Sequence, residues 1–255
     1  IRDSSPSRWL GDVYKRQAVW GAQQGEFKQR GKKDGVFGIW YGKGPGMDRT
    51  MDVFKHANAA GSSKYGGVLA IAGDDHAAKS STLPHQSDHN FMSAFMPYLY
   101  PSGVDEIIRF GLLGIAMSRY SGCWTGFKIV SDVADSGKRY DTALEKFPIV
   151  IPDESFLGEY KDLPRNILYS DTPRDQDYRL QRAKGFAAQE FVRVNNIDIS
   201  MWKTTNSKMG IITAGKSYND VREALRWLNI DEQKAKELGI CIYKVGMPWP
   251  LAVSY

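Results

Sequence analysis

Titratable side chains follow an apolar run in the first third of the chain. Residues 67–73 are apolar and end at Asp74, Asp75 and His76, and a loop rich in hydroxyl, imidazole and amide groups comes next. An apolar run bounded by glycine is typical of a buried strand in a parallel sheet. Because ligands of open α/β sheets bind just beyond the carboxyl ends of such strands, the sequence predicts a small-molecule site here.

The same segment permits a second chemistry, metal binding by Asp and His. The possible ligands lie within residues 74–89, where His85 and His89 stand four residues apart and would share one helix face. Asp and His together suit zinc or manganese, and such a site would make the protein a metal-dependent hydrolase. Gln86 stands where an HExxH motif has its glutamate, so no metal ligand is assigned.

Other polar residues have both a structural and a functional interpretation. Ser80 and Ser81 lack a GxSxG elbow, so they either contact a ligand or cap the next helix. The glycine-rich residues 42–46 either hold a phosphate through backbone N–H groups or form a turn, and they match neither a Walker loop nor a dinucleotide fingerprint. Lys55 and His56, on an expected helix, either face an anionic substrate or lie on a solvated surface.

Strands that alternate with helices must position these residues. Apolar and β-branched runs predict strands over residues 36–41, 68–72 and 125–130. Caps and helical spacing predict a helix that ends near residue 30, and further helices over residues 48–60, 85–95 and 102–117. This alternation predicts an α/β fold with a three-layer parallel sheet.

The second half of the chain changes character. Residues 135–178 lack clean periodicity, which predicts a long connection, and a helix is expected over residues 176–195. A strand over residues 209–215, a helix over 217–228 and a strand over 240–245 then form a β-α-β unit, which opens a second, incomplete α/β domain.

Composition limits the class of protein. The chain has 255 residues, of which 42% are hydrophobic, as in ordinary globular proteins. No apolar run approaches the roughly 20 residues that cross a bilayer. Cys123 and Cys241 are far apart and are expected to be buried free thiols, which fits a cytoplasmic protein and leaves too few cysteines for an iron–sulfur cluster.

The net charge of +5 is concentrated at one end. Residues 1–33 hold eight Lys or Arg and three Asp or Glu, which accounts for the whole excess. Nucleic-acid binding needs clustered positive charge on the folded body, so the sequence argues against it.

Both ends of the sequence look foreign to the rest. Residues 1–17 show no clear periodicity and resemble translated adapter sequence, and residues 252–255 resemble the start of another such tail. We therefore expect residues 18–251 to be a piece of a longer protein; a genuine basic tail is the alternative.

Several long motifs resemble the fused indolepyruvate ferredoxin oxidoreductases. The matching segments, which keep one order from residue 18 to residue 251, are AVWGAQQ (18–24), GVFGIWYGKGPGMDR (35–49), VFKHAN (53–58), GDDH (73–76) with Ser80 and Ser81, HQS (85–87), TAGKSY (213–218) and YKVGMPWPL (243–251). The wider 2-oxoacid ferredoxin oxidoreductases share this architecture more loosely.

The resemblance implies an activity and its cofactors. An aryl 2-oxoacid, typically indolepyruvate, is oxidatively decarboxylated with coenzyme A, and electrons pass through iron–sulfur clusters to ferredoxin. Thiamine diphosphate carries the chemistry, with its pyrimidine half in a Pyr domain and its diphosphate and Mg²⁺ in another domain. A homo-oligomer is also implied.

By the same resemblance, residues 18–150 are most of the Pyr domain, 151–205 an inter-domain connection, and 206–255 the start of a transketolase-C-like domain. The GDG motif of the diphosphate domain and the cluster cysteines are missing, so the chain is expected to be inactive alone. The family glutamate that activates the cofactor would fall at Asp12, inside residues 1–17, and its role is not transferred to Asp12.

The resemblance also names a pocket wall. His76 and His85 are catalytic candidates, Ser80, Ser81 and Gln86 are cofactor-binding candidates, and no metal ligand is implied. The substrate carboxylate would meet Lys43, Lys55 or His56. A non-catalytic binding or assembly module remains the third interpretation of the chain.

Overall fold

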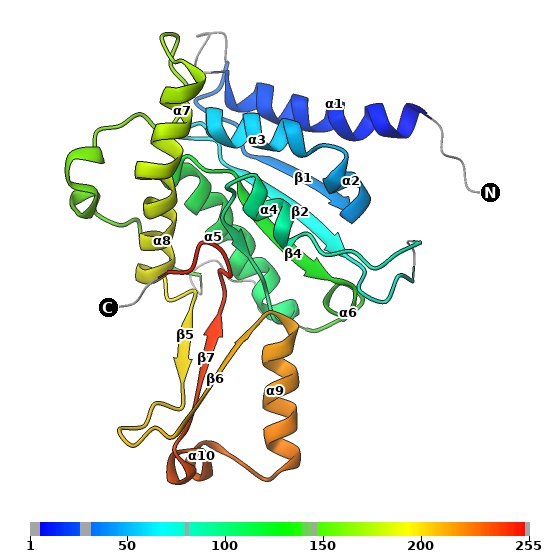
Figure 1. Cartoon of the computed structure of the whole chain (residues 1–255), viewed down its shortest axis with the longest axis vertical. Coiled ribbons are helices and arrows are strands. Elements are labelled where there is room, and N and C mark those ends of the chain that lie inside the picture. The colour runs from blue at the N-terminus through cyan, green and yellow to red at the C-terminus, as the bar shows by residue number, and fades with distance from the viewer. Residues whose placement is uncertain are drawn as a thin grey trace.

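The computed structural model describes residues 6–25, 32–79, 82–139, 141, 143 and 147–252, with side chains from Tyr14 onward. In this part of the chain, a four-stranded sheet A and a three-stranded sheet B are connected by helices (Figure 1). The predicted α/β class is confirmed.

Sheet A consists of parallel strands in the order β1-β2-β4-β3. The strands are β1 Gly38–Lys43, β2 Val68–Asp74, β3 Tyr98–Leu99 and β4 Thr125–Val130. The three longer strands match the predicted ones. The sequence does not predict β3, because this strand has only 2 residues and exists through its pairing with β4.

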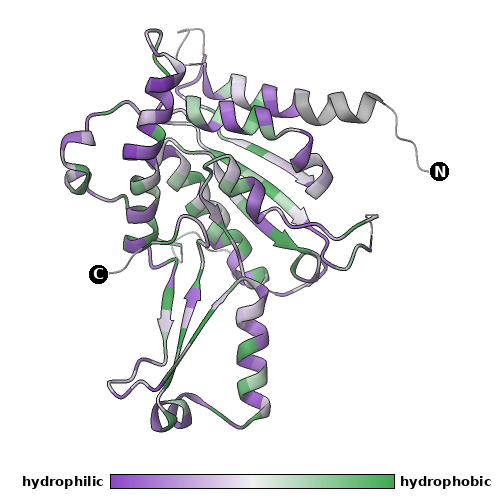
Figure 2. Ribbon diagram, in the orientation of Figure 1, coloured by the Kyte–Doolittle hydropathy of each residue, from purple (hydrophilic) through white to green (hydrophobic). Residues whose placement is uncertain are grey.

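Helices cover both faces of sheet A. On one face, α1 Pro6–Gln23 and α3 Met51–Ala60 pack on a core that includes Trp40 and Phe54. On the other, α5 Val104–Ser121 and α8 Gly185–Val194 enclose a core that includes Phe110 and Phe191. Burial on both faces explains why β2 is apolar almost throughout, as its colour in Figure 2 shows.

The short helices of this half all follow strands or the loop after a strand. They are α2 Gly44–Asp48 directly after β1, α4 Asp88–Ser93 after the loop that follows β2, and α6 Ser131–Ala134 directly after β4. The predicted helices over residues 48–60, 85–95 and 102–117 are confirmed as α3, α4 and α5, with small differences at their ends.

Helix α1 begins earlier than the sequence pattern indicates. The lack of periodicity in residues 1–17 suggests no helix, whereas α1 starts at Pro6. The reason is tertiary: Arg16 is fully buried, with its guanidinium 3.6 Å from the ring centre of Trp40 and 3.2 Å from that of Phe54. Stacking on aromatic faces stabilises a buried guanidinium, and helical periodicity does not detect it.

The described residues of the connection after α6 are irregular, as predicted, apart from the 3₁₀ segment η2 Ser155–Tyr160. Helix α7 Pro173–Arg179 starts at a capping box, in which Thr172 N donates to Asp175 Oδ2 at 2.9 Å. It continues through the π-helical turn η3 Leu180–Lys184 into α8, so the predicted helix over residues 176–195 is confirmed.

Sheet B has the order β5-β7-β6, with β6 and β7 parallel and β5 antiparallel to β7. Its strands are β5 Ile199–Met201, β6 Met209–Ala214 and β7 Ile240–Val245, with α9 Lys216–Trp227 and α10 Glu232–Leu238 between the last two. The predicted β-α-β unit is confirmed. Strand β5, which the sequence does not predict, lies ahead of the domain start expected at residue 206.

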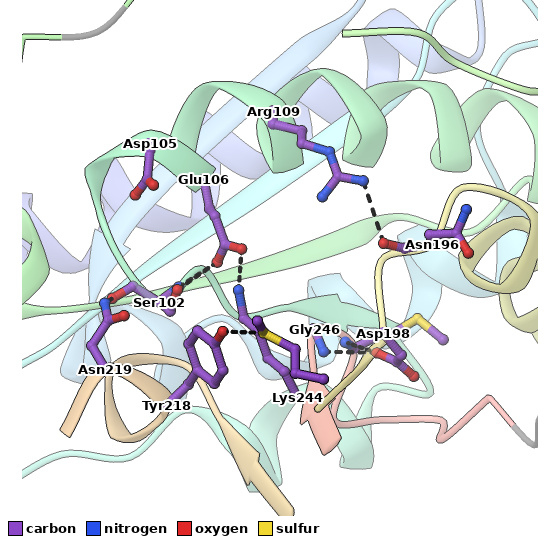
Figure 3. Close-up of polar contacts among 12 residues, drawn as sticks. Ser102, Asp105, Glu106, Arg109, Asn196, Asp198, Tyr218, Asn219, Lys244 and Gly246 are labelled. Carbon is purple, nitrogen blue, oxygen red and sulfur yellow. Dashed lines mark hydrogen bonds and ion pairs between the residues drawn. The ribbon is translucent and has the colours of Figure 1, made fainter. Parts of the chain in front are cut away.

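A buried ion pair and a backbone contact join the two sheets. Lys244 of β7 pairs with Glu106 of α5 (Figure 3). After β7 the chain returns to sheet A, where Tyr98 N donates to Trp249 O at 3.0 Å. The motif at residues 243–251 therefore holds sheet B against sheet A.

Both cysteines are free, as predicted, but only Cys123 is buried. Burial raises the pKa of the Cys123 thiol to about 11. Cys241 is partly exposed because it lies on β7, on the face of sheet B opposite the α9 side. Among the described residues, no helix is both long enough and apolar enough to span a membrane.

Candidate active site at the carboxyl edge of sheet A

A cavity of about 320 Å³ lies where β1, β2 and β4 end. Its lining residues come from the three strand ends and the loops after them: Lys43, Gly73, Asp74, Asp75, Lys79, Ile129, Ser131, Ala134 and Asp135. This is the edge at which the sequence predicts a small-molecule site, because parallel strands end there together.

Asp74 is the central polar residue of this edge. Its side chain is fully buried and accepts hydrogen bonds from Ser87 N at 2.8 Å and Ser87 Oγ at 2.6 Å. Lys128 Nζ lies 3.5 Å from Asp74 Oδ2, the oxygen that also accepts from Ser87 N. A buried carboxylate is tolerated only with such partners, and these contacts fix its orientation.

Lys128 connects Asp74 to a second carboxylate. It projects from β4 with 4% of its surface exposed, and its Nζ lies 2.6 Å from Asp88 Oδ2. Tyr98 donates its hydroxyl to Asp88 Oδ1 at 2.8 Å. Burial of Asp88 opposes its ionisation, but the hydrogen bond and charge of Lys128 outweigh burial and lower the pKa of Asp88. Burial and the Asp88 charge raise the pKa of Tyr98, so the phenol stays a donor.

His85 is held between two carboxylates. Its Nε2 lies 2.9 Å from Asp48 Oδ2, its Nδ1 lies 3.7 Å from Asp74 Oδ1, and only 15% of its side chain is exposed. Burial raises the pKa of Asp48, but hydrogen bonds from Asn90 and His85 outweigh burial and lower it. Nδ1 has no hydrogen-bond partner among the described residues. One ring nitrogen is therefore fixed by Asp48, and the other is buried beside Asp74 without a hydrogen bond, in whichever tautomer the site favours.

The imidazole of His85 leaves no room for a side chain at Gly44. A Cβ atom on Gly44 would lie 1.8 Å from Cγ and Nδ1 of His85, a distance that no side chain tolerates. The glycine-rich segment 42–46 thus has a packing role, because the imidazole lies directly against its backbone. The structure places this segment at the end of β1 and in the first residues of α2, and its phosphate-binding interpretation stays a prediction.

Few of the predicted site residues meet at this edge. Lys43 lines the cavity, and His85 lies behind it, connected through Asp74. The structure leaves the other described candidates exposed and outside the cavity lining: His76, Gln86, Lys55 and His56. His56 lies on α3 beside α1, with its ring centre 6.5 Å from that of Trp20. Ser80 and Ser81 fall outside the described residues.

The sequence interpretation misses Lys128, Asp88 and Tyr98. One signal was available for Lys128: a single lysine within the apolar strand at residues 125–130, where a buried charge requires a partner. Asp88 belongs to the segment 74–89, for which the sequence suggests only metal ligands and no pairing with a lysine. Tyr98 carries no signal, because its strand is not predictable from local pattern.

The metal-site alternative is not supported by the geometry. Within the described ranges, no group of three or more His, Cys, Asp or Glu gathers as a metal site would require. Asp74 and Asp88 instead share Lys128, and His76 and His89 are exposed. The Asp and His residues of this loop thus form a network of hydrogen bonds and ion pairs.

Comparisons with known proteins agree with the motifs. A family model described as the indolepyruvate oxidoreductase domain matches residues 199–255. Subunit IorA of indolepyruvate oxidoreductase from Pyrococcus abyssi (strain GE5 / Orsay) is 28% identical over 212 residues, which cover 81% of this chain and 30% of that protein. The same subunit from Pyrococcus horikoshii is 28% identical over 213 residues, with the same coverage. The chain thus spans less than a third of the length of these relatives.

A solved structure has a similar fold. It is a 2-oxoglutarate:ferredoxin oxidoreductase from Magnetococcus marinus with 2-oxoglutarate, coenzyme A and succinyl-CoA bound. The TM-score is 0.61 at 14% identity, over 95% of this chain and 46% of that one, so this likeness concerns the fold. The two sequence comparisons agree with the resemblance that the motifs carry: this chain is similar to the indolepyruvate oxidoreductases.

Proposed function

We propose that this chain forms part of an oxidoreductase that oxidatively decarboxylates aryl 2-oxoacids, typically indolepyruvate, to acyl-CoA with ferredoxin as electron acceptor. The IorA relatives and the indolepyruvate oxidoreductase domain support the substrate class. The activity belongs to the whole enzyme, and the chain is inactive by itself, because it carries no GDG motif and only two cysteines. Free thiols favour the cytoplasm as its location.

One observation supports this proposal most strongly, the convergence of three motifs of the resemblance. Gly44 and Asp48 belong to the segment 35–49, Asp74 to the segment 73–76 and His85 to the segment 85–87. In the fold they lie in direct contact at the carboxyl edge of sheet A. Residues that are apart in sequence and meet at a strand edge are typical of a site.

The cavity residues fit the pyrimidine half of thiamine diphosphate better than its diphosphate half. Asp74, Asp75 and Asp135 outnumber Lys43 and Lys79 around the cavity, which disfavours a diphosphate. The same carboxylates can accept from a ring amine, and Ser131 and Ile129 add a hydroxyl and an apolar wall. When bound, thiamine diphosphate supplies a nucleophilic carbon and an electron sink for decarboxylation.

The residues of this chain would then position the substrate and transfer protons. His85, fixed by Asp48 and steadied by Asp74, would move a proton at Nδ1, and exposed His76 remains a second candidate. Lys43, which lines the cavity, would attract the substrate carboxylate. Lys55 and His56 remain further candidates for this role, and both lie on the exposed face of α3. Gln86, Ser80 and Ser81 remain proposed contacts of the cofactor.

The domain division remains part of the proposal. A Pyr-type domain over residues 18–150 would contain sheet A, and a connection over 151–205 would contain α7 and α8. A transketolase-C-like domain from residue 206 would contain most of sheet B. The family also leads us to propose that the enzyme is a homo-oligomer.

The replacement His85→Ala tests the function in the complete enzyme that contains this sequence. We expect kcat/KM for indolepyruvate to fall at least tenfold, or about 1.4 kcal/mol in transition-state stabilisation. The matched control is His89→Ala, which removes an exposed histidine on α4 and should change little. An unchanged kcat/KM in His85→Ala would remove His85 from the site, and turnover of no aryl 2-oxoacid by the unmodified enzyme would reject the proposed function.

A further inference from the structure

A second cavity lies at the opposite, amino-terminal edge of sheet A. Its volume is about 1090 Å³, and it lies between the loop before β2, the last turns of α5 and the connection after α6. Strand β2 separates it from the candidate active site, and a strand of 7 residues is about 20 Å long. This cavity therefore belongs to a different site.

The cavity is built around a closely packed backbone segment. A Cβ atom on Gly61 would lie 2.3 Å from Arg165 O, and one on Gly122 would lie 2.5 Å from the same atom. Both glycines have a positive φ, of 102° and 76°, which other residues rarely adopt. The two glycines thus let the backbone of Arg165 lie against the ends of α3 and α5, which fixes where its side chain starts.

Two buried donors of this cavity lack hydrogen-bond partners. Tyr120 is 8% exposed, and its hydroxyl has no hydrogen-bond partner among the described residues. Arg165 has 14% of its side chain exposed, and its Nε is equally unsatisfied. Its Nη2 lies 3.3 Å from Glu154 Oε2, an ion pair without hydrogen-bond geometry. Buried donors normally have partners, so these two point to an acceptor that binds in the cavity.

The charge and the walls of the cavity define that acceptor. The lining contains three cationic side chains, Lys64, Arg119 and Arg165, and one acidic side chain, Glu154, so the cavity favours an anion. The rest of the lining is mainly apolar: Ala116, Ile149, Ile151, Pro152, Pro164, Ile167, Leu168 and Tyr169. Several of these side chains are open to solvent, including Ile151 at 58% and Leu168 at 44% exposure. A ligand with an apolar body and one acidic group would cover the walls and satisfy both donors.

We propose that this cavity binds an apolar carboxylate, with the carboxylate on Arg165 and Tyr120 and the apolar body against Ile151 and Leu168. A guanidinium recognises a carboxylate through charge-assisted hydrogen bonds, and the tyrosine hydroxyl supplies another donor. Aryl acids and alkyl acids share this chemistry. The site is independent of the proposed activity, because it neither contains nor contacts Asp74 or His85.

Ligand-observed NMR on the whole chain tests the proposal, with 4-(trifluoromethyl)phenylacetate as the aryl probe and decanoate as the alkyl probe. We expect saturable binding of at least one probe, and the tighter one identifies the source of the carboxylate. Arg165→Gln should weaken binding by about tenfold or more, because a charge-assisted bond is lost. Tyr120→Phe should weaken it by a smaller factor, and because it preserves the ring it tests the hydroxyl without opening the core.

Two controls locate the binding. Arg193→Gln removes an exposed arginine on α8 and should leave the affinity unchanged. His85→Ala should also leave it unchanged, because His85 belongs to the other edge of the sheet.

Three outcomes would overturn the proposal. The first is the absence of saturable binding by both probes. The second is binding that is lost in His85→Ala and retained in Arg165→Gln, which would place the probe at the candidate active site. The third is binding that disappears as the chain self-associates at higher concentration, which would show that a second copy fills the cavity.

Discussion

Lys128 and Lys244 are two buried lysines in similar surroundings with different consequences. Each lies on an inner strand of its sheet, β4 or β7, with 4% and 2% of its surface exposed. Each has an aromatic ring centre 4.8 Å from its Nζ, that of Tyr100 or Tyr218. Lys128 serves two carboxylates at the candidate active site, whereas Lys244 serves Glu106 at the contact between the sheets.

The difference lies in what each ammonium compensates. Without Lys128, both Asp74 and Asp88 would lose their buried counter-charge. Without Lys244, only Glu106 would lose its counter-charge. Neutral donors remain in both places: Ser102 for Glu106, Ser87 for Asp74 and Tyr98 for Asp88. The same residue type thus organises a site in one sheet and fastens two parts of the fold in the other, and its neighbours decide which.

The largest effect is expected from Lys128→Met. It leaves two carboxylates without their shared cation, so the free energy of unfolding should fall by about 3–5 kcal/mol. Urea denaturation measures this loss. The control is Lys138→Met, whose exposed pair with Asp105 should contribute less than about 1 kcal/mol. Equal losses in the two variants would contradict the importance given to Lys128.

Lys244→Met should cost less, about 2–3 kcal/mol, because it removes the cation from one carboxylate and not from two. The same urea titration compares it with Lys128→Met. A loss as large as that of Lys128→Met would show that the contact between the sheets matters as much for stability as the network at Asp74.

A smaller effect is expected from Gly44→Ala, which places a methyl group against the imidazole of His85. We expect a loss of about 1–3 kcal/mol in unfolding free energy as the ring is displaced. In the complete enzyme, kcat/KM should fall as in His85→Ala. Gly111→Ala is the control, because no atom lies within 4 Å of the new methyl group and a helical alanine should add up to about 1 kcal/mol. An unchanged activity in Gly44→Ala would separate this glycine from the site.

The smallest effect is on the pH dependence of the unfolding free energy. Its sign should differ between Asp88, at the candidate active site, and Asp198, near the contact between the sheets. Lys128 keeps the pKa of Asp88 below its usual value despite burial, so this stabilisation is present above the unfolded pKa of about 3.9. It is lost as the pH falls through the lower folded value. Burial raises the pKa of Asp198, which accepts from Gly246 N near the contact between the sheets. Its contribution is therefore complete below about pH 3.9 and is lost as the pH rises through the higher folded value.

Unfolding free energies measured between about pH 2 and pH 7 test these signs. Asp88→Asn should flatten the loss of stability on the acid side, and Asp198→Asn should flatten the opposite slope above about pH 4. Slopes of the same sign in the two variants would contradict the comparison.

Much of the fold follows from local pattern. Strands β1, β2 and β4, the β-α-β unit of sheet B and the helices α3, α5 and α9 are all visible as apolar runs or helical spacing. Elements that depend on distant partners are not visible. Strand β3 has 2 residues, β5 has 3, and the early start of α1 depends on Arg16 between two rings.

The sequence by itself determined the α/β class, the edge of the sheet at which the candidate site lies, and the family resemblance. It could do so because periodicity and motif order are local properties. Only the tertiary structure decided that Gly44, Asp48, Asp74 and His85 meet, that Lys128 joins two carboxylates, and that Arg165 and Tyr120 face a second cavity. Those facts depend on which strand ends and loops become neighbours, and burial then determines which charges and donors need a partner.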